Sequence, residues 1–175
     1  MVLKFHFCRK VRGFKLSGLL IRFFQKTPFS HVAIEISGDG YHDEPMIFES
    51  VIPMSKRLPL KVWSQEHYEP VLTYTFKIPD HKKSMEIFSE LYAGIDRKYS
   101  TFQILLIGVA MVFPKVHRIF GQKNWNGRYF LHCSEYGARI GRVIGMKFDE
   151  EADTIDLREL QDACEKLKEL GVYNA

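Results

Sequence analysis

The hydrophobic pattern of the chain changes its period near Pro79, and this change restricts the folds that the sequence can form. Before Pro79, apolar, aromatic and β-branched residues gather in short strand-like runs at residues 3–8, 31–36, 46–51 and 69–78. The turn-rich residues 37–45, with Gly38 and Gly40, separate the second run from the third and predict a β-hairpin. The first half of the chain therefore predicts a mainly antiparallel sheet.

Helical patterns dominate the rest of the chain, and one more lies before Pro79. The predicted helices cover residues 16–25, which precede the hairpin, and residues 80–94, 133–144 and 156–171. Asp80 or Ser84 caps the second of these helices, and Asp156 caps the last. Because no repeat or linker interrupts the pattern, we expect one α+β domain over residues 1–175, with the sheet packed against helices.

The composition is that of a compact globular domain, with 46% hydrophobic and 26% charged residues among 175. The 25 Lys and Arg residues and 21 Asp and Glu residues give a net charge of +4, which is spread along the whole chain. This charge is too small and too diffuse for nucleic acid to be the expected main partner. Basic residues near the N-terminus predict solvated surface, with acidic lipid or nucleic acid as the alternative contact.

Neither a disulfide framework nor a cofactor is expected. The three cysteines are odd in number and have no CxxC spacing, which favours a reducing compartment. Cys8 and Cys133, even with His6 and His132, lack the usual spacing of zinc ligands, so we expect no metal.

The chain also shows no targeting or membrane-spanning signal, which predicts a cytoplasmic protein. Its first residues lack the features of a signal peptide, so we expect them to belong to the mature protein. Residues 102–113 form the most apolar segment, but a bilayer span needs roughly 20 residues. We expect a buried helix there, and the alternative is a surface that meets lipid at the membrane periphery.

Cys133 and His31 are the strongest candidates for chemistry. Cys133 lies where a strand-like run, residues 129–131, meets a helical pattern, and a helix N-terminus favours the thiolate form of cysteine. His31 opens an apolar strand, whose backbone can hold an imidazole rigidly. A lone buried cysteine or histidine is usually structural, so the pairing of the two supports catalysis.

A third group must orient the imidazole, and the sequence offers Glu35 or Glu49. Glu35 shares a strand face with His31 but lies too far along the strand for a direct hydrogen bond. Glu49 can lie opposite His31 if the hairpin pairs the two in register. We therefore prefer Glu49 and expect Glu35 to be solvated.

The segments PFSHVAIEI, IFESV and LHCSEY, in this order, resemble the circularly permuted papain-like cysteine hydrolases of the YiiX/YaeF group, relatives of the NlpC-type peptidases. The resemblance implies a permuted papain-like fold. It also implies that Cys133 is the nucleophile, that His31 is the general base and acid, and that Glu49 orients His31. Tyr99, in GIDRKYS, resembles the Gly-x-x-Tyr region of the family and is expected near the substrate, with a packed tyrosine as the alternative.

These expectations describe a cysteine peptidase or amidase that cleaves amide or ester bonds through a thioacyl-enzyme intermediate. The substrate class is an amide- or ester-containing small molecule, peptide or lipid, and the resemblance points to a bacterial or viral source. The alternative is a non-catalytic binding module that keeps a papain-like cleft in a viral or membrane-associated assembly. His132, although adjacent to Cys133, is expected to point to the opposite face and to be a poor base.

Overall fold

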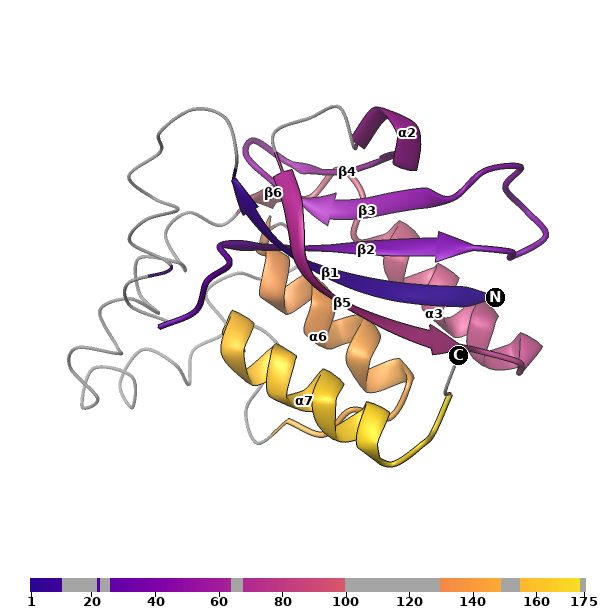
Figure 1. The fold of residues 1–175 in the computed structure, drawn as a ribbon. Coiled ribbons are helices and arrows are strands. Elements are labelled where there is room, and N and C mark those ends of the chain that lie inside the picture. Colours follow the sequence, from indigo (N-terminus) through magenta and orange to yellow (C-terminus); the bar gives the residue numbers. More distant parts are fainter. Residues whose placement is uncertain (11–21, 23–25, 64–67, 100–129, 149–154, 174–175) are drawn as a thin grey trace.

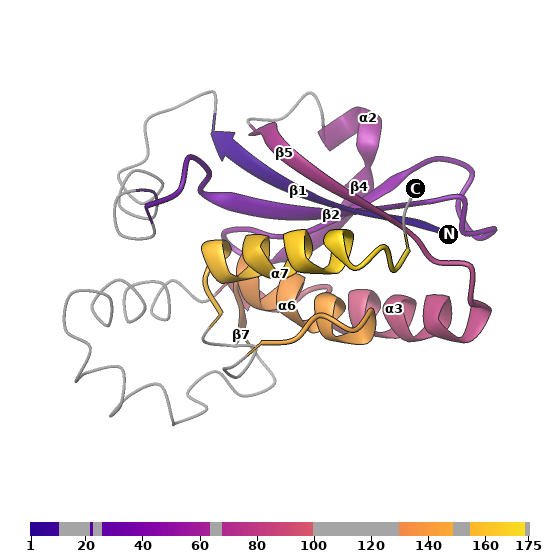
Figure 2. The same cartoon turned by 60° about the horizontal axis from the view of Figure 1, so that its bottom comes forward.

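A five-stranded antiparallel sheet with three long helices on one face forms most of the described part of the protein (Figures 1 and 2). The computed structural model describes residues 1–10, 22, 26–63, 68–99, 130–148 and 155–173. The strand order is β4-β3-β2-β1-β5, and every neighbouring pair is antiparallel. The expected α+β class and mainly antiparallel sheet are confirmed.

The strands of this sheet agree with the hydrophobic runs, except for one additional strand at the edge. They are β1 (Val2–Lys10), β2 (His31–Ser37), β3 (Met46–Ser50), β4 (Ser55–Pro59) and β5 (Tyr68–Lys77). The edge strand β4 was not predicted, because Lys, Arg and Pro residues break its apolar pattern. A separate parallel pair joins β6 (Lys98–Tyr99) to β7 (Phe130–Leu131).

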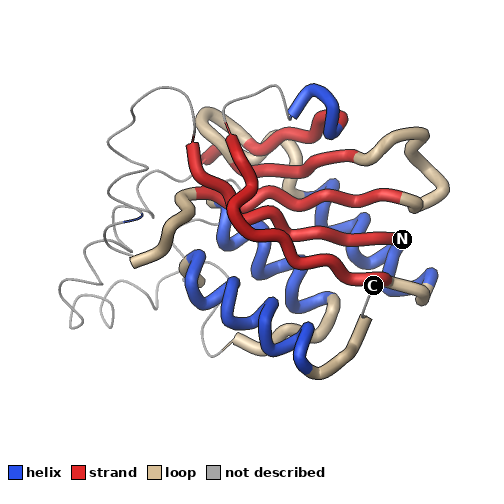
Figure 3. Tube along the Cα trace, viewed as in Figure 1, coloured by secondary structure: helices blue, strands red, loops and turns tan. Residues whose placement is uncertain are grey.

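Three long helices and one short helix complete the described fold (Figure 3). They are α2 (Leu60–Trp63), α3 (His81–Ala93), α6 (Cys133–Val143) and α7 (Leu157–Glu169). The side chains of Asp80 and Asp156 cap α3 and α7 by accepting hydrogen bonds from backbone N–H groups, as expected. The short α2 was not predicted.

The core holds α6 against β2 and β3, with α3 on one side of it and α7 on the other. Apolar side chains from the helix-facing side of the sheet, such as Phe5 and Phe48, pack with the buried sides of α3, α6 and α7. Gly137 on α6 lies so close to Leu160 on α7 that a Cβ atom there would be 2.4 Å from Leu160 Cδ2. The absence of a side chain at Gly137 therefore lets α6 pack closely against α7.

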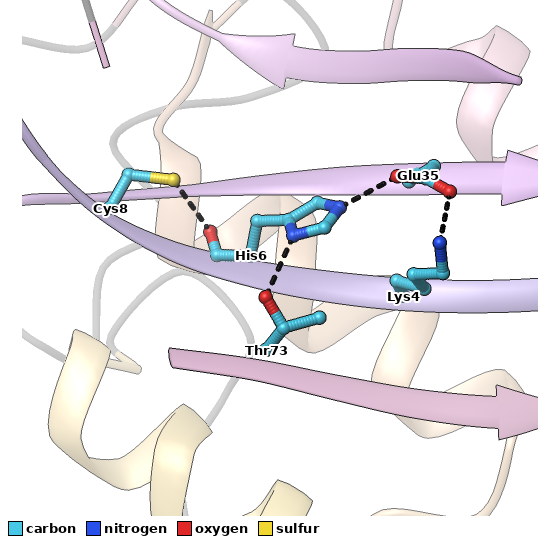
Figure 4. A network of polar contacts seen from close by, with 5 residues as sticks. All are labelled: Lys4, His6, Cys8, Glu35 and Thr73. Atoms are coloured by element: carbon cyan, nitrogen blue, oxygen red, sulfur yellow. Dashed lines mark hydrogen bonds and ion pairs between the residues drawn. The ribbon is translucent and has the colours of Figure 1, made fainter. Parts of the chain in front are cut away.

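The opposite face of the sheet holds a buried polar network, and it corrects the expectation for Glu35 (Figure 4). The side chain of Glu35 is only 2% exposed. Its two carboxylate oxygens bind Lys4 Nζ at 2.6 Å and His6 Nε2 at 2.9 Å, and His6 Nδ1 lies 2.9 Å from Thr73 Oγ1. Glu35 is thus a paired carboxylate, because β1 lies beside β2 and brings a cation and an imidazole to it.

Two predicted segments, residues 16–25 and 102–113, lie in or largely in the part of the chain outside the described residues. Across the ranges that the structure describes, no helix combines the length and the apolar character that crossing a membrane requires.

Candidate active site

The candidate residues gather at one end of the sheet. The start of β2, the end of β3 and the first turn of α6 lie together there, and β6 passes beside them (Figure 1). Each contributes one predicted side chain, namely His31 from β2, Glu49 from β3, Cys133 from α6 and Tyr99 from β6. Segments that are distant in sequence therefore meet at one place.

His31 and Glu49 form a buried hydrogen bond. His31 Nε2 lies 2.8 Å from Glu49 Oε2, and the two side chains are 4% and 0% exposed. The strand register corrects one detail, because Glu49 pairs with Ala33 and not with His31. His31 and Ala33 share one face of β2, so the carboxylate reaches the imidazole diagonally across the pair of strands.

Three further side chains, which the sequence analysis missed, surround this pair. Trp63 Nε1 donates a hydrogen bond of 3.1 Å to Glu49 Oε2, the oxygen that also binds His31. Lys56 Nζ forms an ion pair of 3.4 Å with Glu49 Oε1. The ring of Tyr68 stacks on the imidazole of His31, with 4.5 Å between ring centroids. These contacts restrict the positions of both the carboxylate and the imidazole.

Cys133 is the first residue of α6, and its thiol meets the other side of the imidazole. Nε2 of His31 is occupied by Glu49, so Nδ1 is the nitrogen left for the hydrogen bond with Cys133. The backbone N–H of Val32 also donates to the Cys133 sulfur, and so does the hydroxyl of half-buried Tyr99. Cys133 is 4% exposed, so these contacts form in a site largely shielded from solvent.

The electrostatics of the site favour a thiolate and an imidazolium. Burial raises the pKa of Cys133, but the hydrogen bond and charge of His31 outweigh burial and lower the pKa below its usual value. Burial lowers the pKa of His31, but the hydrogen bonds with Cys133 and Glu49 raise it to about 9. Despite its burial, Glu49 has a lowered pKa because of His31. The Cys133 thiolate and the His31 imidazolium therefore both stay charged between the lowered pKa of Cys133 and the His31 pKa of about 9.

His132, the N-cap residue of α6, belongs to a different network. Its Nδ1 lies 3.2 Å from Glu135 Oε2, and Arg139 holds the other oxygen of Glu135 at 2.7 Å. The side chain of His132 accepts no hydrogen bond from the N–H groups at the start of α6, the turn in which Cys133 lies. His132 is therefore not the hydrogen-bond partner of the thiol, although its charge also lowers the pKa of Cys133.

The other two thiols lie in surroundings of the opposite kind. Cys8 donates a hydrogen bond of 3.2 Å to the carbonyl of His6, and burial raises its pKa. Burial likewise raises the pKa of Cys164 on α7. Of the three cysteines, only Cys133 has a lowered pKa. Among the described residues, no group of three or more His, Cys, Asp and Glu side chains is arranged to hold a metal ion.

No protein-family model matches the chain, and no curated protein matches it either.

We predict that Cys133 reacts with iodoacetamide at pH 7 at least about 10-fold faster than Cys8 and Cys164, because alkylation requires the thiolate. The rate at Cys133 should fall as the pH decreases through its lowered pKa, since protonation removes the thiolate. Mass spectrometry of peptides after timed labelling measures the three cysteines separately. Equal labelling of the three in folded protein would contradict the ion pair.

Proposed function

We propose that the protein is a cysteine hydrolase that cleaves amide or ester bonds through a thioacyl-enzyme intermediate, with Cys133 as nucleophile and His31 as acid and base. The observation that supports this most is the unbroken chain of hydrogen bonds from the Cys133 thiol through His31 to Glu49. A buried nucleophile, a base and an orienting carboxylate in contact are the combination that acyl transfer by a thiol requires.

In the first step, the Cys133 thiolate attacks the carbonyl carbon of the substrate and the carbonyl oxygen becomes an oxyanion. The N–H groups in the first turn of α6, to which the side chain of the N-cap residue His132 does not bind, and the hydroxyl of Tyr99 are donors that can stabilise this charge. The imidazolium of His31 then donates its proton to the leaving amine or alcohol. The C–N or C–O bond breaks, and the acyl group remains on the sulfur.

In the second step, neutral His31 accepts a proton from water, and the resulting hydroxide attacks the thioester. The C–S bond breaks, the carboxylic acid leaves, and Cys133 and His31 return to the ion pair. Glu49 accepts a hydrogen bond from His31 Nε2 throughout, so it keeps the imidazole oriented and stabilises its charged form. No metal or organic cofactor takes part in this scheme.

The proposed family is the permuted papain-like cysteine hydrolases. Three observations support it, namely the order of His31, Glu49 and Cys133 along the chain, an antiparallel sheet with the three long described helices on one face, and a cysteine at the start of a helix. The proposed substrates are amide- or ester-containing peptides, lipids or small molecules. A binding module would have no chemical need for the lowered thiol pKa, which favours the hydrolase over this alternative.

Exposure of the protein to a panel of activated acyl esters and peptide amides tests the proposal. We expect intact-mass spectrometry to detect an acyl adduct and peptide mapping to locate it on Cys133. Cys133→Ala should show neither adduct nor turnover, whereas Cys164→Ala, which also shortens a buried helical thiol, should retain both. Turnover by Cys133→Ala with unchanged circular dichroism would contradict the proposal.

Glu49→Gln should lower kcat by about 10²–10⁴, because the amide keeps the shape of the side chain but lacks the charge that stabilises the imidazolium. Loss of this charge also lowers the pKa of His31, so the alkaline limb of the pH–rate profile should move below about 9. Glu35→Gln is the matched control, since it changes a second buried carboxylate that binds His6 and not His31. A larger effect of Glu35→Gln on kcat would refute the assignment of Glu49.

A further inference from the structure

Two large apolar side chains are exposed in the four-residue loop, residues 51–54, that joins β3 to β4. Ile52 is 56% exposed and Met54 is 42% exposed. Hairpin loops usually present polar or small residues to water, so two exposed apolar side chains in one short loop require an explanation.

The loop is held firmly at its base and along its backbone. Ser50 and Ser55 pair across its base, and their hydroxyl groups are 3.0 Å apart in a buried position. Tyr99 N–H donates a hydrogen bond of 2.9 Å to the carbonyl of Pro53, and Met54 forms an isolated bridge with Lys98. These contacts hold the backbone of the loop in place, and the side chains of Ile52 and Met54 are exposed in this conformation.

The same contacts place the loop beside the nucleophile. Tyr99, whose N–H binds the loop, donates its hydroxyl to the Cys133 sulfur, and its strand pairs with Leu131, two residues before Cys133. At its other side, the loop follows Glu49 by two residues. Ile52 and Met54 thus belong to a loop that hydrogen bonds directly to the residue that contacts the thiol.

We propose that residues 51–54 form the apolar wall of the substrate site, and that the substrate carries an extended apolar group next to the scissile carbonyl. This inference rests on the function proposed above and narrows its substrate class. An alkyl chain or an apolar amino-acid side chain supplies this chemistry. In each case, burial of the apolar group against Ile52 and Met54 holds the carbonyl near the sulfur.

The test uses maleimides, which form a bond between the thiolate sulfur and their carbon–carbon double bond, so it needs no knowledge of the natural substrate. We expect N-octylmaleimide to label Cys133 at least about 10-fold faster than N-methylmaleimide at pH 7, because each fully buried methylene contributes a roughly four-fold gain. N-isobutylmaleimide and N-benzylmaleimide carry groups like the aliphatic and aromatic side chains of amino acids and distinguish the two sources, since one of them should react faster than the octyl reagent if the wall receives an apolar amino-acid side chain.

The double variant Ile52→Ser/Met54→Ser should reduce the octyl-to-methyl ratio to about 1, and the use of a ratio cancels any change that the variant causes in the reactivity of the thiol itself. The matched control is Leu170→Ser/Val172→Ser, which removes two apolar residues with the same spacing and with exposures of 74% and 41% beyond the end of α7. This control should keep the wild-type ratio.

A wild-type ratio near 1, or a ratio that the loop variant does not lower, would overturn the inference. The wild-type ratio needs no variant. If the double variant does not fold, Ile52→Ser and Met54→Ser, each made singly, take its place. Failure of the proposed function gives a different result from failure of this inference. In that case Cys133 would take up no acyl group from any ester or amide, even if it reacts with maleimides.

Discussion

The hydrogen bond between His31 and Glu49 is the interaction on which the rest of the site depends. Glu49 has no solvent exposure, and an ionised carboxylate in such a position is strongly destabilising unless cations or hydrogen-bond donors surround it. His31, Trp63 and Lys56 provide these partners from three different elements. The ends of β2, β3 and β4 and the short α2 must therefore come together for the carboxylate to be buried.

The imidazolium that Glu49 stabilises then determines the state of the thiol. Burial alone would keep Cys133 protonated and unreactive, as it does Cys8 and Cys164. The hydrogen bond with His31 and its charge, together with the charge of His132 and the hydrogen bond from the Val32 N–H, outweigh burial and lower the pKa of Cys133. A difference in hydrogen-bond partners, and not in burial, thus separates the candidate nucleophile from the structural thiols.

Sequence patterns predicted the main strands and helices and the meeting of Cys133, His31 and Glu49, because strand period and a helix start determine where these side chains point. They did not predict the pairing of Glu49 with Ala33, since the hairpin loop that sets the register is too long to indicate its turn type. Glu35 was misjudged because its partners come from β1, and sequence alone does not show which strand lies beside β2.

Trp63 and Tyr68 were also missed, for a related reason. Both flank a stretch without clear periodicity, and their importance arises only where the chain folds α2 and the start of β5 over His31 and Glu49. The local pattern around a residue predicts its secondary structure, but contacts across the sheet determine its role in the site.

NMR titration of the His31 imidazole, in the wild-type protein and in Cys133→Ala, tests the central claim most directly. The account predicts that His31 titrates at about pH 9 in the wild type and at a clearly lower pH in the variant, because removal of the thiolate leaves burial opposed by Glu49 alone. A pKa of His31 that is the same in both proteins would contradict the thiolate–imidazolium pair.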